Sequence, residues 1–324
     1  MPEAGQATYL ITGGTGSLGT ALTHKLLSEG HKVRVYARNE HGHEKLEKSV
    51  KPEHKARFSS LIGDVRDVER LKRAMTGAWY VVHAAAQKII PLAEYNPRDC
   101  IQTNVGGTAN VIEACLDCGV EKAILISTDK ARAPSTLYGA SKLCAERLWL
   151  AANRYRGADH GIFAAVAYGN VWGSNGSVLH AFVEQAQYGA LKLTDPECTR
   201  FNILMSEAVA LVEKAIAEAN PGELWIPKLP SYSLRDLAEA FRRAYKLERE
   251  VLVTGLRPGE KRHEDLISEN ESCTVSEETT ERYVMTPGVN HQAGGWSYGS
   301  GKNKWRLSVA ILEKLIRDTL GVEG

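Results

Sequence analysis

The sequence predicts an α/β protein with a doubly wound parallel sheet and a smaller C-terminal domain. Short apolar segments alternate with longer amphipathic segments over the first half, as in βαβ units. A glycine-rich turn joins the first of these apolar segments to the first amphipathic one. The alternation stops near residue 170, where Gly, Asn and Pro become frequent.

Six short apolar segments are expected as strands: 9–12, 32–37, 57–62, 80–83, 123–127 and 162–167. A helix with Leu18, Leu22 and Leu26 on one stripe follows the first strand and ends at Gly30. Further helices are expected at about 104–118 and over 138–154. Because strands separated by helices need right-handed crossovers, the economical topology is a Rossmann-like doubly wound sheet.

Shorter elements follow residue 170. They include an apolar segment at 224–227, a helix at 234–245 and a final helix at about 308–320. The polar stretch 275–282 is expected to be a mobile loop. We therefore divide the chain into residues 1–170 and residues 171–324, with some crossing between the two, and place a second ligand site where the smaller domain covers the strand ends.

Composition excludes several classes of protein. The 324 residues are 43% hydrophobic and 24% charged, and 40 basic against 39 acidic residues give a formal net charge of +1. A nucleic-acid binder would normally carry a basic excess. No apolar run approaches the roughly 20 residues of a membrane span, and the N-terminus lacks the plan of a signal peptide. We expect a cytoplasmic protein with neither nucleic acid nor membrane as partner.

The cysteines are expected to be reduced thiols. Cys115 and Cys118 form a C-x-x-C, a spacing that can indicate redox or zinc chemistry. Here the pair lies in a helical pattern that ends at Gly119, with no second pair nearby. We interpret both as packing residues of a helix and expect no metal site.

The glycine-rich turn predicts a dinucleotide site. Gly13 allows a tight turn, Gly16 lets the backbone approach a pyrophosphate, and Gly19 allows the helix to pack closely on the strand. The pyrophosphate would then face the N–H groups at the helix N-terminus.

The end of the second strand favours NADP over NAD. An acidic residue there would accept hydrogen bonds from a ribose 2′-OH, but the sequence has Arg38, which can pair with a 2′-phosphate. The alternative is a solvated surface arginine. The expected cofactor-binding residues are Gly13, Thr15, Gly16, Ser17, Leu18, Gly19, Ala37, Arg38, Asp64, Val65, Ala84, Ala85, Ser127, Tyr138 and Lys142.

Tyr138 and Lys142 form a Y-x-x-x-K on the third predicted helix. Four-residue spacing places both side chains on one helix face. The Lys142 ammonium could lower the pKa of the Tyr138 phenol and make it a usable base near neutral pH.

These motifs resemble the extended short-chain dehydrogenase/reductase family. Within it, the chain is similar to UDP-N-acetylglucosamine 4,6-dehydratases of bacterial polysaccharide and flagellin-sugar biosynthesis. The supporting motifs are His83-Ala84-Ala85-Ala86, Thr128-Asp129-Lys130, Tyr138-x-x-x-Lys142, Tyr168-Gly169-Asn170-Val171 and Arg257-Pro258-Gly259-Glu260-Lys261. The resemblance implies a complete enzyme without the N-terminal membrane region of some relatives, with residues 1–170 binding NADP and 171–324 binding a UDP-sugar, assembled as a homo-oligomer.

The resemblance also implies a reaction in which hydride leaves C4 of the sugar and returns to C6. Tyr138 would take the proton of the 4-OH, and a neutral Lys130 would remove the C5 proton. A protonated Asp129 would donate to the departing 6-hydroxyl, and Thr128 belongs to the same catalytic segment. Without the family context, adjacent Asp129 and Lys130 at a strand end would be interpreted as a solvated turn.

Further positions match residues that contact the nucleotide sugar in this group. These expected substrate-binding residues are Lys88, Asn170, Asn175, Gly176, Ser177, Val178, Leu179, Arg200 and Arg257. Other positions depart from the usual pattern and alter the expected pocket: Gln87, Ala167, Asn175, His180 and Asn202. The identity of the hexose and the fate of the C5 stereocentre therefore stay open.

Two other functions compete with this hypothesis. A 4-epimerase or reductase of the same fold would need no base for C5 and no acid for the 6-hydroxyl, so the Thr128-Asp129-Lys130 segment argues against it. A non-catalytic NADP sensor would often lack the tyrosine or the lysine, but Tyr138 and Lys142 are both present.

Overall fold

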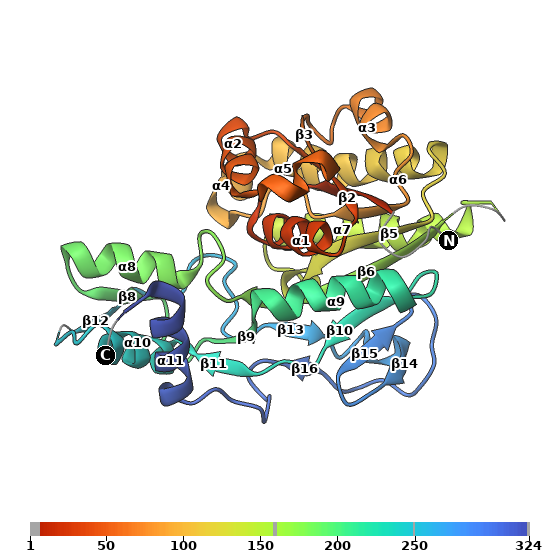
Figure 1. The fold of residues 1–324 in the computed structure, drawn as a ribbon. Helices are drawn as coiled ribbons and strands as arrows, with labels where there is room; N and C mark the ends of the chain where they lie inside the picture. Colours follow the sequence, from red (N-terminus) through yellow and green to blue (C-terminus); the bar gives the residue numbers. More distant parts are fainter. Residues whose placement is uncertain (1–6, 158–160, 249, 323–324) are drawn as a thin grey trace.

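A nine-stranded sheet forms the centre of the computed structural model, which describes residues 7–157, 161–248 and 250–322 (Figure 1). The strand order is β14-β15-β10-β6-β5-β4-β1-β2-β3. The strands from β3 to β10 are parallel, and β15 and β14 add antiparallel to one edge. The predicted doubly wound α/β fold is confirmed.

All six predicted strands are present, with ends that differ by at most one residue. They are β1 (Thr8–Thr12), β2 (Lys32–Ala37), β3 (Phe58–Ile62), β4 (Tyr80–His83), β5 (Lys122–Thr128) and β6 (Ile162–Tyr168). Strand β1 is buried at all five positions. A strand covered on both faces by helices needs apolar side chains at every position, which explains why these strands are recognisable as continuous apolar runs.

Helices cover both faces of the sheet (Figure 1). Helix α1 (Ser17–Ser28) packs with α9 (Met205–Glu218) on one face. On the other face lie α3 (Val68–Met75), α6 (Gly107–Asp117) and α7 (Leu137–Ala151). Helix α2 (Glu40–Ser49) lies beside β3, and the short helices α4 (Ile90–Tyr95) and α5 (Pro97–Ile101) pack on α7.

The predicted helix over 104–118 is two elements. A π-helix over Gln102–Gly106 precedes α6, which ends where Cys118 caps it before Gly119 at φ +66°. All six cysteines are free, and Cys115 is buried in the core. The interpretation of the C-x-x-C as part of a packed helix is confirmed.

The second half of the chain contributes more to the large sheet than the sequence suggested. Strand β10 (Leu224–Pro227), expected in the smaller domain, pairs parallel with β6. The expected mobile loop 275–282 instead forms β14 (Val275–Glu278) and the turn before β15 (Arg282–Met285). Its polar residues are explained by its place at the sheet edge, where Ser276, Glu277 and Glu278 are exposed.

The smaller unit has a core of its own, below and to the left in Figure 1. Its helices are α8 (Val178–Tyr188), α10 (Leu234–Ala244) and α11 (Val309–Leu320). Strands β7 (Asn170–Val171), β9 (Thr199–Ile203) and β11 (Ser231–Ser233) form a three-stranded sheet. Strand β8 (Leu191–Leu193) pairs with β12 (Val251–Val253), and β13 (Asp265–Ile267) with β16 (Tyr298–Gly299). The boundary at residue 170 stays a prediction, with α9, β10, β14 and β15 crossing it.

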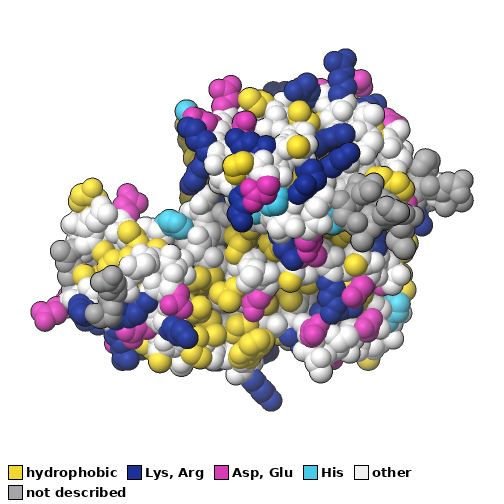
Figure 2. Space-filling view, viewed as in Figure 1, with side chains coloured by type: hydrophobic (Ala, Val, Ile, Leu, Met, Phe, Trp, Pro, Cys, Tyr) yellow, Lys and Arg dark blue, Asp and Glu magenta, His cyan; other side chains and the backbone are white. Residues whose placement is uncertain are grey.

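Charges on the surface are mixed. Figure 2 shows Lys and Arg side chains interspersed with Asp and Glu over both parts of the visible face, in keeping with the net charge of +1. Within the described part of the chain, no helix has the length and apolar character that crossing a membrane requires.

A buried arginine joins three parts of the chain behind the end of β5. The guanidinium of Arg132 is fully buried and binds Glu146 of α7 and Glu271, which follows β13. Ser127 of β5 also donates to Glu146, 2.5 Å away. This cluster fixes the turn after β5 against the helix that carries Tyr138 and against the C-terminal half.

We expect Arg132→Met to lower the free energy of unfolding by about 3–5 kcal/mol, because it leaves buried carboxylates without their cation. Urea unfolding of the full chain measures the change. Arg147→Met is the matched control, since Arg147 binds the same Glu271 from a side chain that is 42% exposed; a change below about 1 kcal/mol is expected there. Equal losses of unfolding free energy in the two variants would show that the burial of Arg132 does not increase its contribution to stability.

Candidate active site

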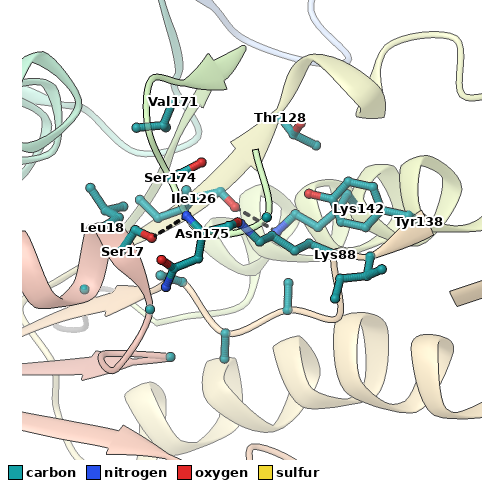
Figure 3. A pocket seen from close by; sticks show the side chains of 18 of the residues that line it. Ser17, Leu18, Lys88, Ile126, Thr128, Tyr138, Lys142, Val171, Ser174 and Asn175 are labelled. Carbon is teal, nitrogen blue, oxygen red and sulfur yellow. Dashed lines mark hydrogen bonds between the residues drawn. The ribbon is translucent and has the colours of Figure 1, made fainter. Parts of the chain in front are cut away.

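A cleft of about 770 Å³ lies where the carboxyl ends of the parallel strands meet the smaller unit (Figure 3). Strand order reverses between β1 and β4, because β1 continues to β2 on one side while β4 continues to β5 on the other. Ligands of doubly wound sheets bind at this switch point. The cleft is therefore the expected place for a cofactor and a substrate.

The glycine turn shapes one end of the cleft for a bound group. A Cβ at Gly13 would lie 2.7 Å from the backbone of Ala85, and Gly13 has φ +68°. A Cβ at Gly19 would lie 2.4 Å from Gly14 Cα, so only glycine lets α1 pack this closely. Gly16 caps α1 without a side-chain hydrogen bond, which leaves the helix N-terminus facing the cleft. A dinucleotide pyrophosphate fits this cradle.

Arg38 stands at the end of β2 beside the cleft. Its side chain is 55% exposed, and its Nη1 lies 3.7 Å from Asp64 Oδ2. Asp64 itself is bound by Arg66 at 2.6 Å and does not line the cleft. Burial alone would raise the pKa of Asp64, but the hydrogen bonds from Arg66 outweigh burial and hold that pKa below its usual value. Arg38 is thus only loosely engaged and can reach an anionic group in the cleft.

A neutral histidine joins β1 to β4 beneath the cofactor end. His83 Nδ1 lies 2.6 Å from Thr12 Oγ1, and its Nε2 lies 3.0 Å from Thr108 Oγ1. Complete burial, together with the smaller effect of the Lys142 cation, lowers the pKa of His83 to about 3. The strand ends are therefore held together without adding charge to the site.

Tyr138 and Lys142 both line the cleft from the same face of α7, as predicted. Lys142 Nζ donates to the backbone oxygen of Ile126 at 2.7 Å, and burial lowers its pKa to about 8. Burial raises the pKa of Tyr138 to about 12, although Lys130 and Thr128 act in the opposite direction. The sequence predicts that Lys142 lowers the phenol pKa. In the structure the pKa is raised instead, because the effect of burial is larger than that of the nearby Lys130 cation.

Lys130 lies among carboxylates at the end of β5. Its Nζ is 3.0 Å from Asp129 Oδ1 and 3.7 Å from Glu264 Oε1. Burial lowers the pKa of Lys130, but the two carboxylates raise it more, so the ammonium form is favoured. Two negative charges face the amine, so the neutral Lys130 that the predicted mechanism needs is not the favoured form here, and its role as a base stays a prediction.

The turn that holds Lys130 is built by its own residues. Thr128 caps the 3₁₀-helix Asp129–Ala131 by accepting from the Lys130 backbone N–H at 3.3 Å, and donates to Asp129 Oδ1 at 2.9 Å. Asp129 is fully buried and does not line the cleft, whereas Thr128 and Lys130 do. Burial also raises the pKa of Glu264, against the effect of Lys130.

A loop of the smaller unit crosses the cleft (Figure 3). The Asn175 backbone N–H donates to Ser17 Oγ at 3.1 Å, and Lys88 Nζ donates to the Asn175 carbonyl at 3.1 Å. The loop thus contacts both the glycine turn and the segment after β4. Burial lowers the pKa of Lys88.

The structure brings most of the predicted residues to one cleft. Those that line it are Gly13, Thr15, Gly16, Ser17, Leu18, Gly19, Ala37, Arg38, Val65, Ala84, Ala85, Lys88, Ser127, Thr128, Lys130, Tyr138, Lys142, Asn170, Asn175, Gly176, Ser177 and Arg257. Asp64, Asp129, Val178, Leu179 and Arg200 do not line it.

The side chain of Arg200 does not line the cleft. It is 7% exposed, and its guanidinium binds Glu260 and the backbone oxygens of Thr199 and Arg262. Its predicted contact with a diphosphate would require it to leave these partners. Arg257 also binds Glu260, but it is 62% exposed and lines the cleft.

Among the residues that sequence reasoning missed are Asn104 and Glu264, which do not line the cleft themselves. Asn104 of the π-helix bonds the backbone of Gln87 on both sides and donates to Ser141 Oγ at 2.9 Å, so it positions the segment after β4 against α7. An interruption in the 104–118 helix pattern would have been its signal. Glu264 had no signal, because only the fold brings it to Lys130. Within the described ranges, no group of three or more His, Cys, Asp or Glu could hold a metal ion.

The chain matches known proteins over nearly its whole length. Residues 9–287 match the family described as polysaccharide biosynthesis protein. An inverting UDP-N-acetylglucosamine 4,6-dehydratase of Campylobacter jejuni is 42% identical over 96% of this chain and 98% of that protein. A protein of Methanocaldococcus jannaschii described as an uncharacterized membrane protein is also 42% identical, over 96% of this chain and 95% of that one.

Other similar proteins carry different descriptions. A UDP-glucose 4-epimerase of Rickettsia rickettsii is 36% identical over 83% of this chain and 80% of that protein. The X-ray structure of Pen from Bacillus thuringiensis superposes with a TM-score of 0.92 at 33% identity, covering 98% of this chain and 99% of that one.

We expect Gly19→Ala to weaken NADP+ binding at least about tenfold, because its Cβ would push α1 away from the glycine turn. Isothermal titration calorimetry measures the affinity. Gly106→Ala is the control: nothing lies within 4 Å of its added Cβ, so affinity should stay unchanged. Unaltered binding in Gly19→Ala would show that this close packing does not build the cofactor site.

Proposed function

Because the chain belongs to the polysaccharide biosynthesis protein family of extended short-chain dehydrogenases/reductases, and is an enzyme of its nucleotide-sugar 4,6-dehydratase group, we propose that it dehydrates a UDP-N-acetylhexosamine with NADP+. UDP-N-acetylglucosamine is the first candidate substrate. The observation that carries the proposal is the placement of Lys130, between Asp129 and Glu264, in the same cleft as Tyr138.

The first part of the proposed reaction, oxidation at C4, belongs to the cofactor and to Tyr138. When bound, the nicotinamide cofactor supplies the hydride acceptor for C4 and the hydride donor for C6. Tyr138 faces the cleft from α7 and takes the proton of the 4-OH. Since burial raises its pKa to about 12, this role depends on the Lys130 cation and the Thr128 hydroxyl, which oppose the effect of burial.

The chemistry at C5 and C6 belongs to the turn after β5. Oxidation at C4 acidifies the neighbouring C5 proton, which Lys130 removes in its amine form. Asp129 touches Lys130 and lies behind it rather than on the cleft surface, so its donation to the 6-hydroxyl needs a rearrangement or a relay through Lys130 or Thr128. A 4-epimerase requires none of these groups.

Basic residues along the cleft supply local anion recognition. Lys88 and Arg257 line it and suit the diphosphate of a UDP-sugar. Arg38 suits a 2′-phosphate and supports NADP over NAD. A homo-oligomer stays a prediction that the family suggests, and the configuration of the product at C5 stays open.

A second candidate is a UDP-sugar 4-epimerase, which the 36% identity to the Rickettsia rickettsii protein favours. One experiment separates the two. With UDP-N-acetylglucosamine in D2O followed by NMR, we expect a 4-keto-6-deoxy sugar that carries deuterium at C5. Lys130→Ala should bind NADP+ normally and form no such product. A 4-epimer formed without loss of water would establish the epimerase instead.

We expect Arg38→Ala to weaken NADP+ binding about tenfold while changing NAD+ binding much less, because only NADP+ carries the 2′-phosphate. Titration calorimetry with both dinucleotides gives the ratio of affinities. Arg73→Ala removes an exposed arginine of α3 that does not line the cleft, and should change neither affinity. An equal loss for both dinucleotides would contradict the assignment of Arg38 to the 2′-phosphate.

A further inference from the structure

Glu264 is held rigidly beside the catalytic turn by the C-terminal part of the chain. It precedes β13, and both of its backbone groups bond Ser300: its N–H donates to Ser300 Oγ at 2.9 Å, and its carbonyl accepts from the Ser300 N–H at 2.8 Å. The residue is 4% exposed. Its backbone therefore has a fixed position, from which the buried carboxylate faces Lys130 at the end of β5.

Its surroundings leave the carboxylate only partly satisfied. Oε1 lies 3.7 Å from Lys130 Nζ, and Oε2 is buried without a hydrogen-bond partner. Lys130 Nζ also donates to Asp129 at 3.0 Å and to Asn170 at 3.3 Å. A buried oxygen without a partner is costly, and it is also a place where a proton can be held.

Lys130 has to lose a proton before it can act as a base. With Asp129 and Glu264 both ionised, the amine stays an ammonium ion and cannot take a proton from carbon. Asp129 also has a buried oxygen without a partner, Oδ2, but its Oδ1 accepts from both Thr128 and Lys130. Glu264 is the one of the two carboxylates whose position does not depend on the Thr128–Asp129 turn.

On the premise of the proposed function, we propose that Glu264 is the proton partner of Lys130: it takes the ammonium proton when a sugar fills the cleft and so frees the amine for the C5 proton. It acts through Lys130 and not on the substrate, which makes it a positioning residue.

The proton transfers close without an added reagent. One N–H bond of Lys130 breaks and an O–H bond forms on Glu264. The lone pair of the amine then takes the C5 proton, and the C–H electron pair moves toward the C4 carbonyl. The enolate then expels the 6-hydroxyl, which leaves as water; the proton that this consumes is balanced by the one that Tyr138 takes from the 4-OH. After hydride has returned to C6, the Lys130 ammonium protonates C5, and Glu264 returns its proton to the amine.

Exclusion of water drives the first transfer. Burial disfavours the charged form of both partners. When a sugar displaces water from the cleft, the neutral amine and carboxylic acid therefore become more stable relative to the ion pair. The side chains must approach by several tenths of an ångström, as is common between ligand-free and substrate-bound sites. The other charged or titratable groups that act on this pair are Asp129, Tyr138, Arg200, Tyr232 and Lys261.

Glu264→Gln tests the proposal because it keeps the size of the side chain and removes its ability to take a proton. The measurement is the rate of deuterium uptake at C5 from pH 6 to 9, expressed as the ratio of variant to wild type at each pH. We expect the ratio to be about 0.1 or lower at pH 7 and to rise with pH, as solvent replaces Glu264 as proton acceptor.

Two further variants make the result specific. Glu264→Asp keeps a carboxylate and should give a ratio that does not change with pH. Glu269→Gln removes an exposed carboxylate of the same segment and should match wild type throughout. A ratio for Glu264→Gln that is constant with pH, as a purely structural role would give, or a ratio above one at pH 7, overturns the proposal.

A titration without substrate separates this proposal from the proposed function. In 13C-lysine-labelled protein, with the Lys130 signal assigned through Lys130→Met, loss of the Glu264 charge should let Lys130 deprotonate at lower pH than in wild type. Identical titration overturns the role of Glu264. If wild type fails to convert UDP-N-acetylglucosamine, the proposed function fails while this titration still reports on Glu264.

Discussion

The buried ion cluster around Arg132 is the interaction on which the arrangement of the site depends. It joins the turn after β5 to helix α7 through Glu146 and to the C-terminal half through Glu271. Lys130 lies on that turn and Tyr138 on that helix, so their relative position is set by a contact that lies outside the cleft. A fully buried guanidinium needs both carboxylates, which couples the two halves of the chain.

Burial and neighbouring carboxylates together set the charge of the titratable groups at the site. His83 is kept neutral where the strands β1 and β4 meet, and Lys142 is shielded so that burial lowers its pKa to about 8. The pKa of Lys130 is raised instead, because Asp129 and Glu264 stabilise its ammonium form. These two lysines of the cleft thus behave in opposite ways, and the difference comes mainly from the two carboxylates that face Lys130.

Local composition determined much of what the sequence could predict. The six strands, the glycine turn, the Tyr138–Lys142 pair and the segment Thr128-Asp129-Lys130 are each defined by residues close together in the chain, and the structure gathers nearly all of them at one cleft. Strands buried on both faces are continuous apolar runs, and a helix spacing of four residues fixes which side chains share a face. Such features need no knowledge of distant contacts.

Only the tertiary structure decided the favoured protonation states of Tyr138 and Lys130 and the contacts that the second half of the chain makes with them. In the sequence β10 is a short isolated apolar segment. In the structure it pairs with the edge strand β6 of the parallel sheet and extends that sheet. Arg200 was expected at the substrate but is held by Glu260, and Glu264 was not singled out at all although it faces Lys130. Burial raises the pKa of Tyr138, and Glu264 adds to the effect of the neighbouring Asp129 on the pKa of Lys130. Neither the burial nor the position of Glu264 is encoded in a local stretch of sequence.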